Sequence, residues 1–239
     1  MLFAFGDSIM KGIIANNNNN NGTNTTELRG GLIKYVITDN NFVSRIESHN
    51  GKTIRNLSRF GSTILGGLKN LDRHLREIQP GDTVVLEFGG NDCNFDWKAI
   101  AEDPYKEHKP SVTLEEFRKL YREAIEKVLS VGAKPVLLSL PAILPLRFFD
   151  FVSQGLNKDN ILLWLGGDTN TIANWHEQYN LEIFKIGAEQ GVPVIDISTT
   201  FLSRRGLGDC YCIDGMHPNE LGHDIIAEAI LTSGQLECA

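Results

Sequence analysis

The chain has 239 residues, 41% of them hydrophobic, with 23 lysines and arginines against 30 aspartates and glutamates. A net charge of −7 argues against nucleic acid as a partner, because phosphate binding depends on concentrated basic side chains. No apolar run reaches the roughly 18 residues that a membrane-spanning helix needs, and residues 1–5 lack the basic and long apolar regions of a signal peptide. The sequence therefore predicts one globular domain over residues 1–239, located in the cytoplasm.

Short apolar runs along the chain predict a set of buried β-strands. The last three are rich in Val, Ile and Leu without alternation, which is typical of strands that are covered on both faces. The runs are Leu2–Phe5, Thr53–Leu57, Thr83–Phe88, Pro135–Leu140 and Pro193–Ile197.

Apolar residues at helical spacing between and after these runs predict helices. The second helix is introduced by Thr113 with Glu116 three residues later, which is the pattern of a capping box. The last begins at Pro218 or Asn219. The apolar stripes cover Ile64–Ile78, Phe117–Val128, Ile172–Ile186 and Leu221–Ala229.

The alternation of strands and helices predicts an α/β fold with a parallel sheet between two layers of helices. The expected architecture is a three-layer α/β/α sandwich, flavodoxin-like, with about five strands in the order 2-1-3-4-5. The run of asparagines at Asn16–Asn21 favours turns, so we expect a surface loop there.

Polar and glycine-rich segments follow three of the predicted strands. Gly6–Ser8 (Gly-Asp-Ser) comes directly after the first strand, Asn56–Gly61 lies at the end of the second, and Gly89–Asp92 (Gly-Gly-Asn-Asp) follows the third. Open parallel sheets bind ligands outside the carboxyl ends of their strands, where the strand order reverses. These segments therefore lie where the predicted fold would place a binding site.

Asp214 and His217 stand three residues apart, between the last strand and the final helix. A carboxylate at that spacing can accept the imidazole Nδ1–H and leave Nε2 free to take a proton from a nucleophile. Ser8 supplies a hydroxyl that needs such a base. The backbone N–H groups of Ser8 and Gly61 and the side-chain amide of Asn91 could then bind the resulting oxyanion.

These segments, in this order, resemble the four conserved blocks of the SGNH (GDSL) hydrolase superfamily, over about residues 3–231. The first block reads Gly-Asp-Ser-Ile where the family pattern has Gly-Asp-Ser-Leu. The resemblance implies that Ser8 is the nucleophile, that Asp214 and His217 complete the triad, and that Gly61 and Asn91 help to form the oxyanion hole. It also implies a lipase, esterase, thioesterase or carbohydrate deacetylase, without metal or cofactor.

The favoured interpretation is therefore a serine esterase that acts on a small-molecule ester, with a short acyl or O-acetyl group preferred. Two alternatives remain open. Asp7, Asn91, Asp92 and His217 could be ligands of a metal-dependent phosphoesterase. The chain could also be a catalytically silent, flavodoxin-like binding module.

The irregular stretches after the third and fourth strands contain aromatic residues that could wall a substrate pocket above Ser8 or pack as satellites of the core. Asp7 and Asp92 are expected to brace their turns through backbone N–H groups. His223 is expected to be structural, and His176 shows no partner pattern that suggests chemistry. The candidate pocket residues are Phe95, Trp97, Phe148 and Trp164.

Overall fold

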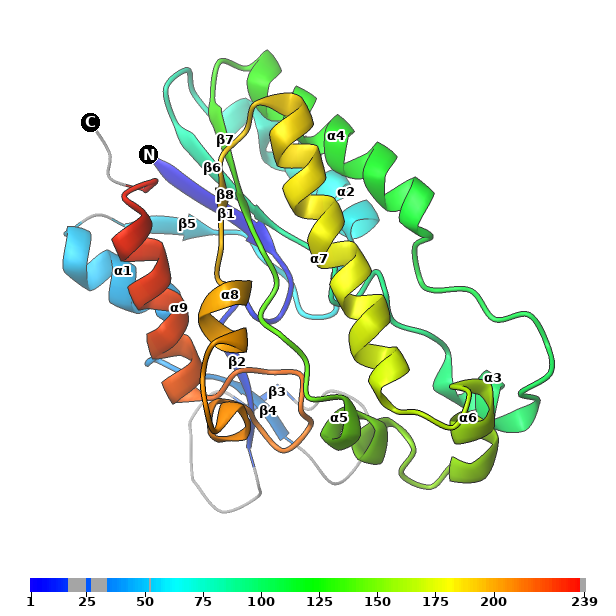
Figure 1. Ribbon diagram of the computed structural model, residues 1–239. Helices are drawn as coiled ribbons and strands as arrows, with labels where there is room; N and C mark the ends of the chain where they lie inside the picture. Colours follow the sequence, from blue (N-terminus) through cyan, green and yellow to red (C-terminus); the bar gives the residue numbers. More distant parts are fainter. Residues whose placement is uncertain (17–24, 27–33, 52, 237–239) are drawn as a thin grey trace.

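A five-stranded parallel sheet forms the centre of the computed structural model, which describes residues 1–16, 25–26, 34–51 and 53–236 (Figure 1). Its strand order is β5-β1-β6-β7-β8, which corresponds to 2-1-3-4-5 when these five strands are numbered along the chain and confirms the predicted topology. The strands are β1 (Leu2–Gly6), β5 (Ile54–Asn56), β6 (Thr83–Glu87), β7 (Lys134–Leu138) and β8 (Val194–Ile195).

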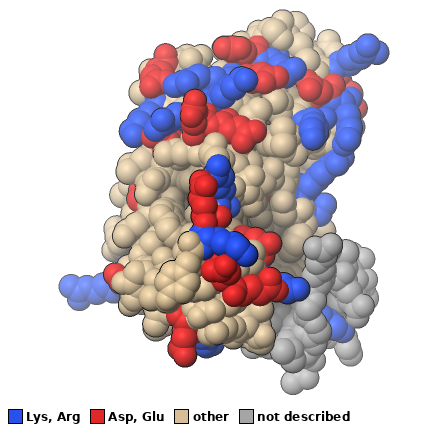
Figure 2. Space-filling view, turned by 90° about the vertical axis from the view of Figure 1, so that its right-hand side faces the viewer, with Lys and Arg blue, Asp and Glu red and all other residues tan. Residues whose placement is uncertain are grey.

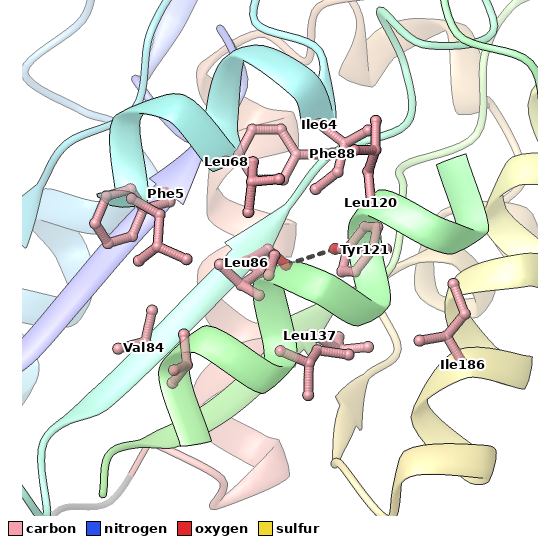
Figure 3. Close-up of a cluster of buried hydrophobic side chains, with 14 of the residues drawn as sticks. Phe5, Ile64, Leu68, Val84, Leu86, Phe88, Leu120, Tyr121, Leu137 and Ile186 are labelled. Carbon is pink, nitrogen blue, oxygen red and sulfur yellow. Dashed lines mark hydrogen bonds between the residues drawn. The ribbon is translucent and has the colours of Figure 1, made fainter. Parts of the chain in front are cut away.

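Successive residues of the central strands enter opposite hydrophobic cores. In β1, Phe3 and Phe5 pack into one buried cluster, whereas Leu2 and Ala4 pack into the other. Side chains of a strand point alternately to the two faces of a sheet, so a run that is apolar at every position serves both cores. Figure 3 shows the first cluster, in which Phe5 lies with side chains from β6, β7 and the helices above them.

Helices cover both faces of the sheet, as the sandwich architecture requires (Figure 1). The first core lies under α2 (Ile64–His74), α4 (Leu114–Ser130) and α7 (Asn170–Gln190). The second lies under α1 (Phe42–Asn50), α8 (Ser198–Leu202) and α9 (Glu220–Ser233). Among the described residues, no helix combines the length and the apolar character that a membrane crossing requires.

The helix boundaries agree with the capping signals. Thr113 accepts a hydrogen bond from Glu116 N at 3.3 Å and begins α4. Asn219, rather than Pro218, is the N-cap of α9, and its side chain accepts from Gly222 N at 3.1 Å. The first predicted helix is shorter than its stripe, because α2 ends at His74 and a 3-10 turn, η1 (Leu75–Glu77), follows.

A second, antiparallel sheet was not expected from the sequence. It joins β2 (Ile13–Asn16), β4 (Lys34–Ile37) and β3 (Thr25–Thr26) in the order β2-β4-β3. The predicted loop at Asn16–Asn21 is therefore wrong at Asn16, which ends β2, and its other residues lie outside the described part of the chain. Two of these strands are four residues long and one is two, so alternation alone gives little signal.

Three further short helices lie beyond the carboxyl ends of the strands: α3 (Trp97–Glu102), α5 (Pro145–Val152) and α6 (Lys158–Trp164). They share a separate hydrophobic cluster that includes Trp97, Phe148 and Ile161. A second 3-10 turn, η2 (Leu207–Cys210), precedes the loop that leads to α9. On the face shown in Figure 2, lysine and arginine side chains are interspersed with acidic ones instead of forming a basic patch.

Candidate active site

Ser8 stands in the turn that follows β1, and that turn is held by hydrogen bonds on both sides. Lys11 N donates to Asp7 O at 3.1 Å and Ile13 N donates to Ser8 O at 2.9 Å. The Asp7 carboxylate accepts from Ile9 N at 2.8 Å, so it braces the turn. The Ser8 side chain is thereby fixed at the carboxyl end of a central strand and is mostly buried.

The loop between η2 and α9 places Asp214 and His217 together. One oxygen of Asp214, Oδ1, accepts from Met216 N and His217 N, each at 3.0 Å. The other, Oδ2, lies 2.7 Å from His217 Nδ1. Gly215 has a φ of 71°, a left-handed conformation that favours glycine, and an added Cβ would lie 2.8 Å from Phe148 N. The loop can therefore close only with glycine at this position.

The structure brings the two ends of the chain together, because His217 Nε2 lies 2.8 Å from Ser8 Oγ. Asp214 and His217 are 0% and 1% exposed, so their contact is shielded from water. A network of this kind fixes the imidazole tautomer: Nδ1 carries the proton toward Asp214, and Nε2 faces the hydroxyl as an acceptor. The arrangement can remove a proton from Ser8.

The charge of the Asp214 carboxylate is stabilised by its surroundings. Burial raises the pKa of Asp214, but the hydrogen bond and charge of His217 and the two backbone N–H groups outweigh it, so the net pKa lies below its usual range. The rings of Tyr35 and Phe60 lie 5.2 and 6.2 Å from the His217 ring. They cover the imidazole with apolar surface from β4 and from the turn after β5.

Two of the three expected oxyanion donors lie on the cavity beside Ser8. Ser8 N donates to no acceptor among the described residues, and Asn91 is one of the residues that line the cavity. Asn91 Nδ2 donates one hydrogen to Asp7 Oδ2 at 2.7 Å, which leaves its second hydrogen available. Gly61 lies in the adjacent turn, where Arg59 N donates to Gly6 O at 3.0 Å, and does not line this cavity.

The cavity beside Ser8 has a volume of about 30 Å³ and is walled mainly by apolar side chains. Three of the four predicted pocket residues line it: Phe95, Trp97 and Phe148. Trp164 does not; its ring lies 4.9 Å from the Phe95 ring and supports the wall from behind. The aromatic stretches after β6 and β7 thus form part of this cavity.

His176 also lines the cavity, although its sequence context suggested no chemistry. It is 8% exposed, and burial lowers its pKa to about 4, so the ring is uncharged at neutral pH. A sequence signal existed, because His176 falls four residues after Ile172 and three before Tyr179, on the buried stripe of α7. Trp175 beside it adds a further wall residue.

Two polar residues near the site have structural roles. Asp92 Oδ1 accepts from Ile64 N at 2.9 Å, so it braces the start of α2 rather than only its own turn. Burial raises the pKa of Asp92 to about 7. His223 is fully buried against Phe42, with the two rings stacked 5.7 Å apart, which is a packing contact.

Three of the four side chains that a metal-dependent phosphoesterase would use, those of Asp7, Asn91 and His217, are engaged with protein groups. Asp7 accepts from Ile9 N and from Asn91 Nδ2 through separate oxygens, and both ring nitrogens of His217 face Asp214 and Ser8. A metal ion would have to displace these contacts. This geometry supports nucleophilic chemistry at Ser8 more directly than metal ligation.

Comparisons with known proteins give a consistent result. A GDSL-like lipase/acylhydrolase family model matches residues 2–230. An uncharacterised esterase of Bacillus subtilis strain 168, YxiM, is 29% identical over 184 residues, an alignment that covers 73% of this chain and 40% of that protein. The alignment therefore spans less than half the length of this relative.

Solved structures share the fold. A member of the lipolytic G-D-S-L family from Veillonella parvula has a TM-score of 0.62 at 17% identity, covering 97% of this chain and 96% of that one. A catalytic mutant of an acetylxylan esterase from Geobacillus stearothermophilus has a TM-score of 0.58 at 19% identity, covering 100% and 95%. With a family match that spans nearly the whole sequence, the chain belongs to the GDSL-like lipase/acylhydrolase family.

Proposed function

We propose that this protein is a serine esterase that cleaves a small carboxylic ester through an acyl-serine intermediate. The observation that carries the proposal is the 2.8 Å contact between Ser8 Oγ and His217 Nε2, with His217 Nδ1 held by Asp214. A buried imidazole between a hydroxyl and a carboxylate is the arrangement that activates a serine.

In the proposed reaction, Ser8 Oγ attacks the ester carbonyl carbon while His217 Nε2 takes the hydroxyl proton. The Asp214 carboxylate stabilises the imidazolium that forms. Collapse of the tetrahedral intermediate breaks the bond to the alcohol oxygen, which leaves with the proton from His217. Water then attacks the acyl-serine by the same steps, releasing the acid and restoring the Ser8 hydroxyl.

The oxyanion would be bound by Ser8 N and the Asn91 side-chain amide, with Gly61 N proposed as a third donor. Removing one such donor costs about 10²–10³ in kcat. We expect Asn91→Ala to lower kcat by about that factor while KM changes little, because the donor acts mainly on the transition state. Asn94→Ala, which alters another amide on the same cavity wall, is the matched control. If the two variants lowered kcat equally, Asn91 would not be a donor of the oxyanion hole.

The size of the cavity supports a preference for short acyl groups. Its volume is about 30 Å³, and aromatic side chains make up much of its wall. Trp97 and Phe148 line the cavity and also belong to a packed hydrophobic cluster, so enlarging the cavity requires their displacement. That an acetylxylan esterase shares the fold agrees with acetyl removal on this scaffold.

Turnover of p-nitrophenyl esters tests both parts of the proposal. We expect p-nitrophenyl acetate to give a higher kcat/KM than the octanoate. Phe148→Ala should reduce the difference in kcat/KM between the two esters, because it enlarges the cavity. A rapid burst of p-nitrophenol equal to the enzyme concentration is expected wherever deacylation limits the rate. An octanoate that turns over as fast as the acetate would contradict the acyl preference. Activity lost to EDTA and restored by manganese would instead favour the metal-dependent alternative.

A further inference from the structure

A third carboxyl group lies directly behind the turn that carries Ser8. Glu87 is the last residue of β6 and pairs in register with Gly6 of β1. Its Oε2 accepts from Asp7 N at 3.2 Å, and a Cβ added to Gly6 would lie 2.7 Å from that same oxygen. The side chain is therefore packed against the peptide that leads into the nucleophile.

Glu87 shares its buried environment with two other acids. Asp7 and Asp92 are 2% and 0% exposed, and Glu87 is 0% exposed. Within the described part of the chain, none of the three forms an ion pair with a lysine or arginine, and Glu87 Oε1 and Asp92 Oδ2 have no hydrogen-bond partner. A buried carboxylate without a positively charged partner is costly, so the three acids cannot all be ionised at the same time.

The other groups that face this cluster do not compensate its charge. Tyr121 of α4 donates its hydroxyl hydrogen to Leu86 O at 3.1 Å, as Figure 3 shows, and Glu87 helps to raise its pKa. Burial, and then the charge of Asp7, hold the pKa of Glu87 well above its usual range.

The contacts indicate where the negative charge resides. Asp7 receives Ile9 N on one oxygen and Asn91 Nδ2 on the other, and its carboxyl group lies within hydrogen-bonding reach of Glu87. Glu87 accepts from Asp7 N, the Met10 backbone also acts to lower its pKa, and one of its oxygens has no partner. Ile9 N and the Asn91 amide stabilise a carboxylate at Asp7, and the charge of Asp7 raises the pKa of Glu87, so Glu87 holds the proton.

We propose that Glu87 is a positioning residue that remains protonated and donates its hydrogen to Asp7, which in turn holds the Asn91 amide toward the oxyanion. The proposal rests on the esterase function given above. Glu87 touches no reacting atom; it acts through Asp7 and Asn91. Its neutrality also keeps a second negative charge away from the place where the oxyanion develops.

This role makes a prediction about pH. A group whose pKa is raised keeps its proton below that pKa, so the Asp7–Asn91 arrangement is intact on the acid side of the raised pKa of Glu87. As pH rises through the pKa of Glu87, the donor is lost and a second charge appears beside Asp7. We expect kcat of the wild type to fall on the alkaline side for this reason.

The test compares two substitutions at Glu87. Glu87→Gln keeps an acceptor for Asp7 N and a permanent donor for Asp7, whereas Glu87→Leu has neither. We expect Glu87→Leu to lower kcat by about 10–100-fold with little change in KM, as supporting residues typically do. Glu87→Gln should recover most of that loss and should lack the alkaline fall. Glu182→Gln is the matched control, because Glu182 is buried in α7 but pairs with Arg118, away from the site.

A second measurement does not depend on turnover or on the stability of the leucine variant. Infrared difference spectra of wild type against Glu87→Gln at neutral pH should show the carbonyl band of a protonated carboxyl group. An active wild type without that band, or Glu87→Gln with the alkaline fall of the wild type, overturns the role of Glu87. The band in a protein without esterase activity would instead contradict the proposed function.

Discussion

Replacing Ser8 with alanine is expected to lower kcat on p-nitrophenyl acetate by about 10⁵–10⁶-fold, as loss of the nucleophile does in other serine hydrolases. The substitution removes only Oγ, whose hydrogen-bond partner is His217 Nε2 at 2.8 Å. The turn is held by backbone bonds and by Asp7, so the fold should survive. Steady-state kinetics and a thermal melt measure the two effects separately.

Ser153→Ala is the matched control for that experiment. Ser153 is equally enclosed, and its hydroxyl has no hydrogen-bond partner within the described residues. Its removal should leave kcat close to that of the wild type. A Ser8→Ala enzyme that keeps more than about a hundredth of the wild-type kcat would show that another group performs the attack.

Asp214→Asn is expected to have the second largest effect, a loss of about 10⁴ in kcat. Asparagine can still accept the two backbone N–H groups of Met216 and His217 through its oxygen. Its amide would then face His217 Nδ1 as a donor, which forces the imidazole into the tautomer whose Nε2–H cannot accept the Ser8 proton. The loop geometry should persist while the base is lost.

The pH dependence distinguishes this loss from a simple loss of packing. In the wild type, the lowered pKa of Asp214 keeps the carboxylate ionised at neutral pH, so activity should fall only as acid protonates the triad.

Asp196→Asn is the control for Asp214→Asn, because Asp196 is an exposed carboxylate that accepts from Thr199 N at 2.9 Å. If Asp214→Asn and Asp196→Asn had similar kcat values, Asp214 would have no part in catalysis.

Much of the fold could be predicted because the central strands are buried on both faces. The run Thr83–Phe88 is apolar at most positions, and β6 (Thr83–Glu87) occupies nearly the same residues. The terminal strand was overestimated: β8 is confined to Val194–Ile195, within the predicted Pro193–Ile197. In the β2-β4-β3 sheet, β2 pairs with a segment about twenty residues away, which local patterns do not reveal.

The candidate triad could be located because each of its parts belongs to a short motif at the end of a strand or the start of a helix. Ser8 follows β1 directly, and Asp214 and His217 share one loop. His176 and Glu87 were missed because their surroundings come from elements distant in sequence. A glutamate inside an otherwise apolar strand was a usable signal, since a buried carboxyl group must be neutral or compensated.

The most direct test of the whole account is covalent labelling with a fluorophosphonate, followed by mass spectrometry of the intact protein and its peptides. Because the Ser8 hydroxyl is the activated one, we expect a single adduct, located at Ser8, in the wild type and in Ser153→Ala. The Ser8→Ala protein should gain no mass. Labelling of Ser8→Ala to the same extent, or an adduct on a different residue of the wild type, would contradict the assignment of Ser8 as the nucleophile.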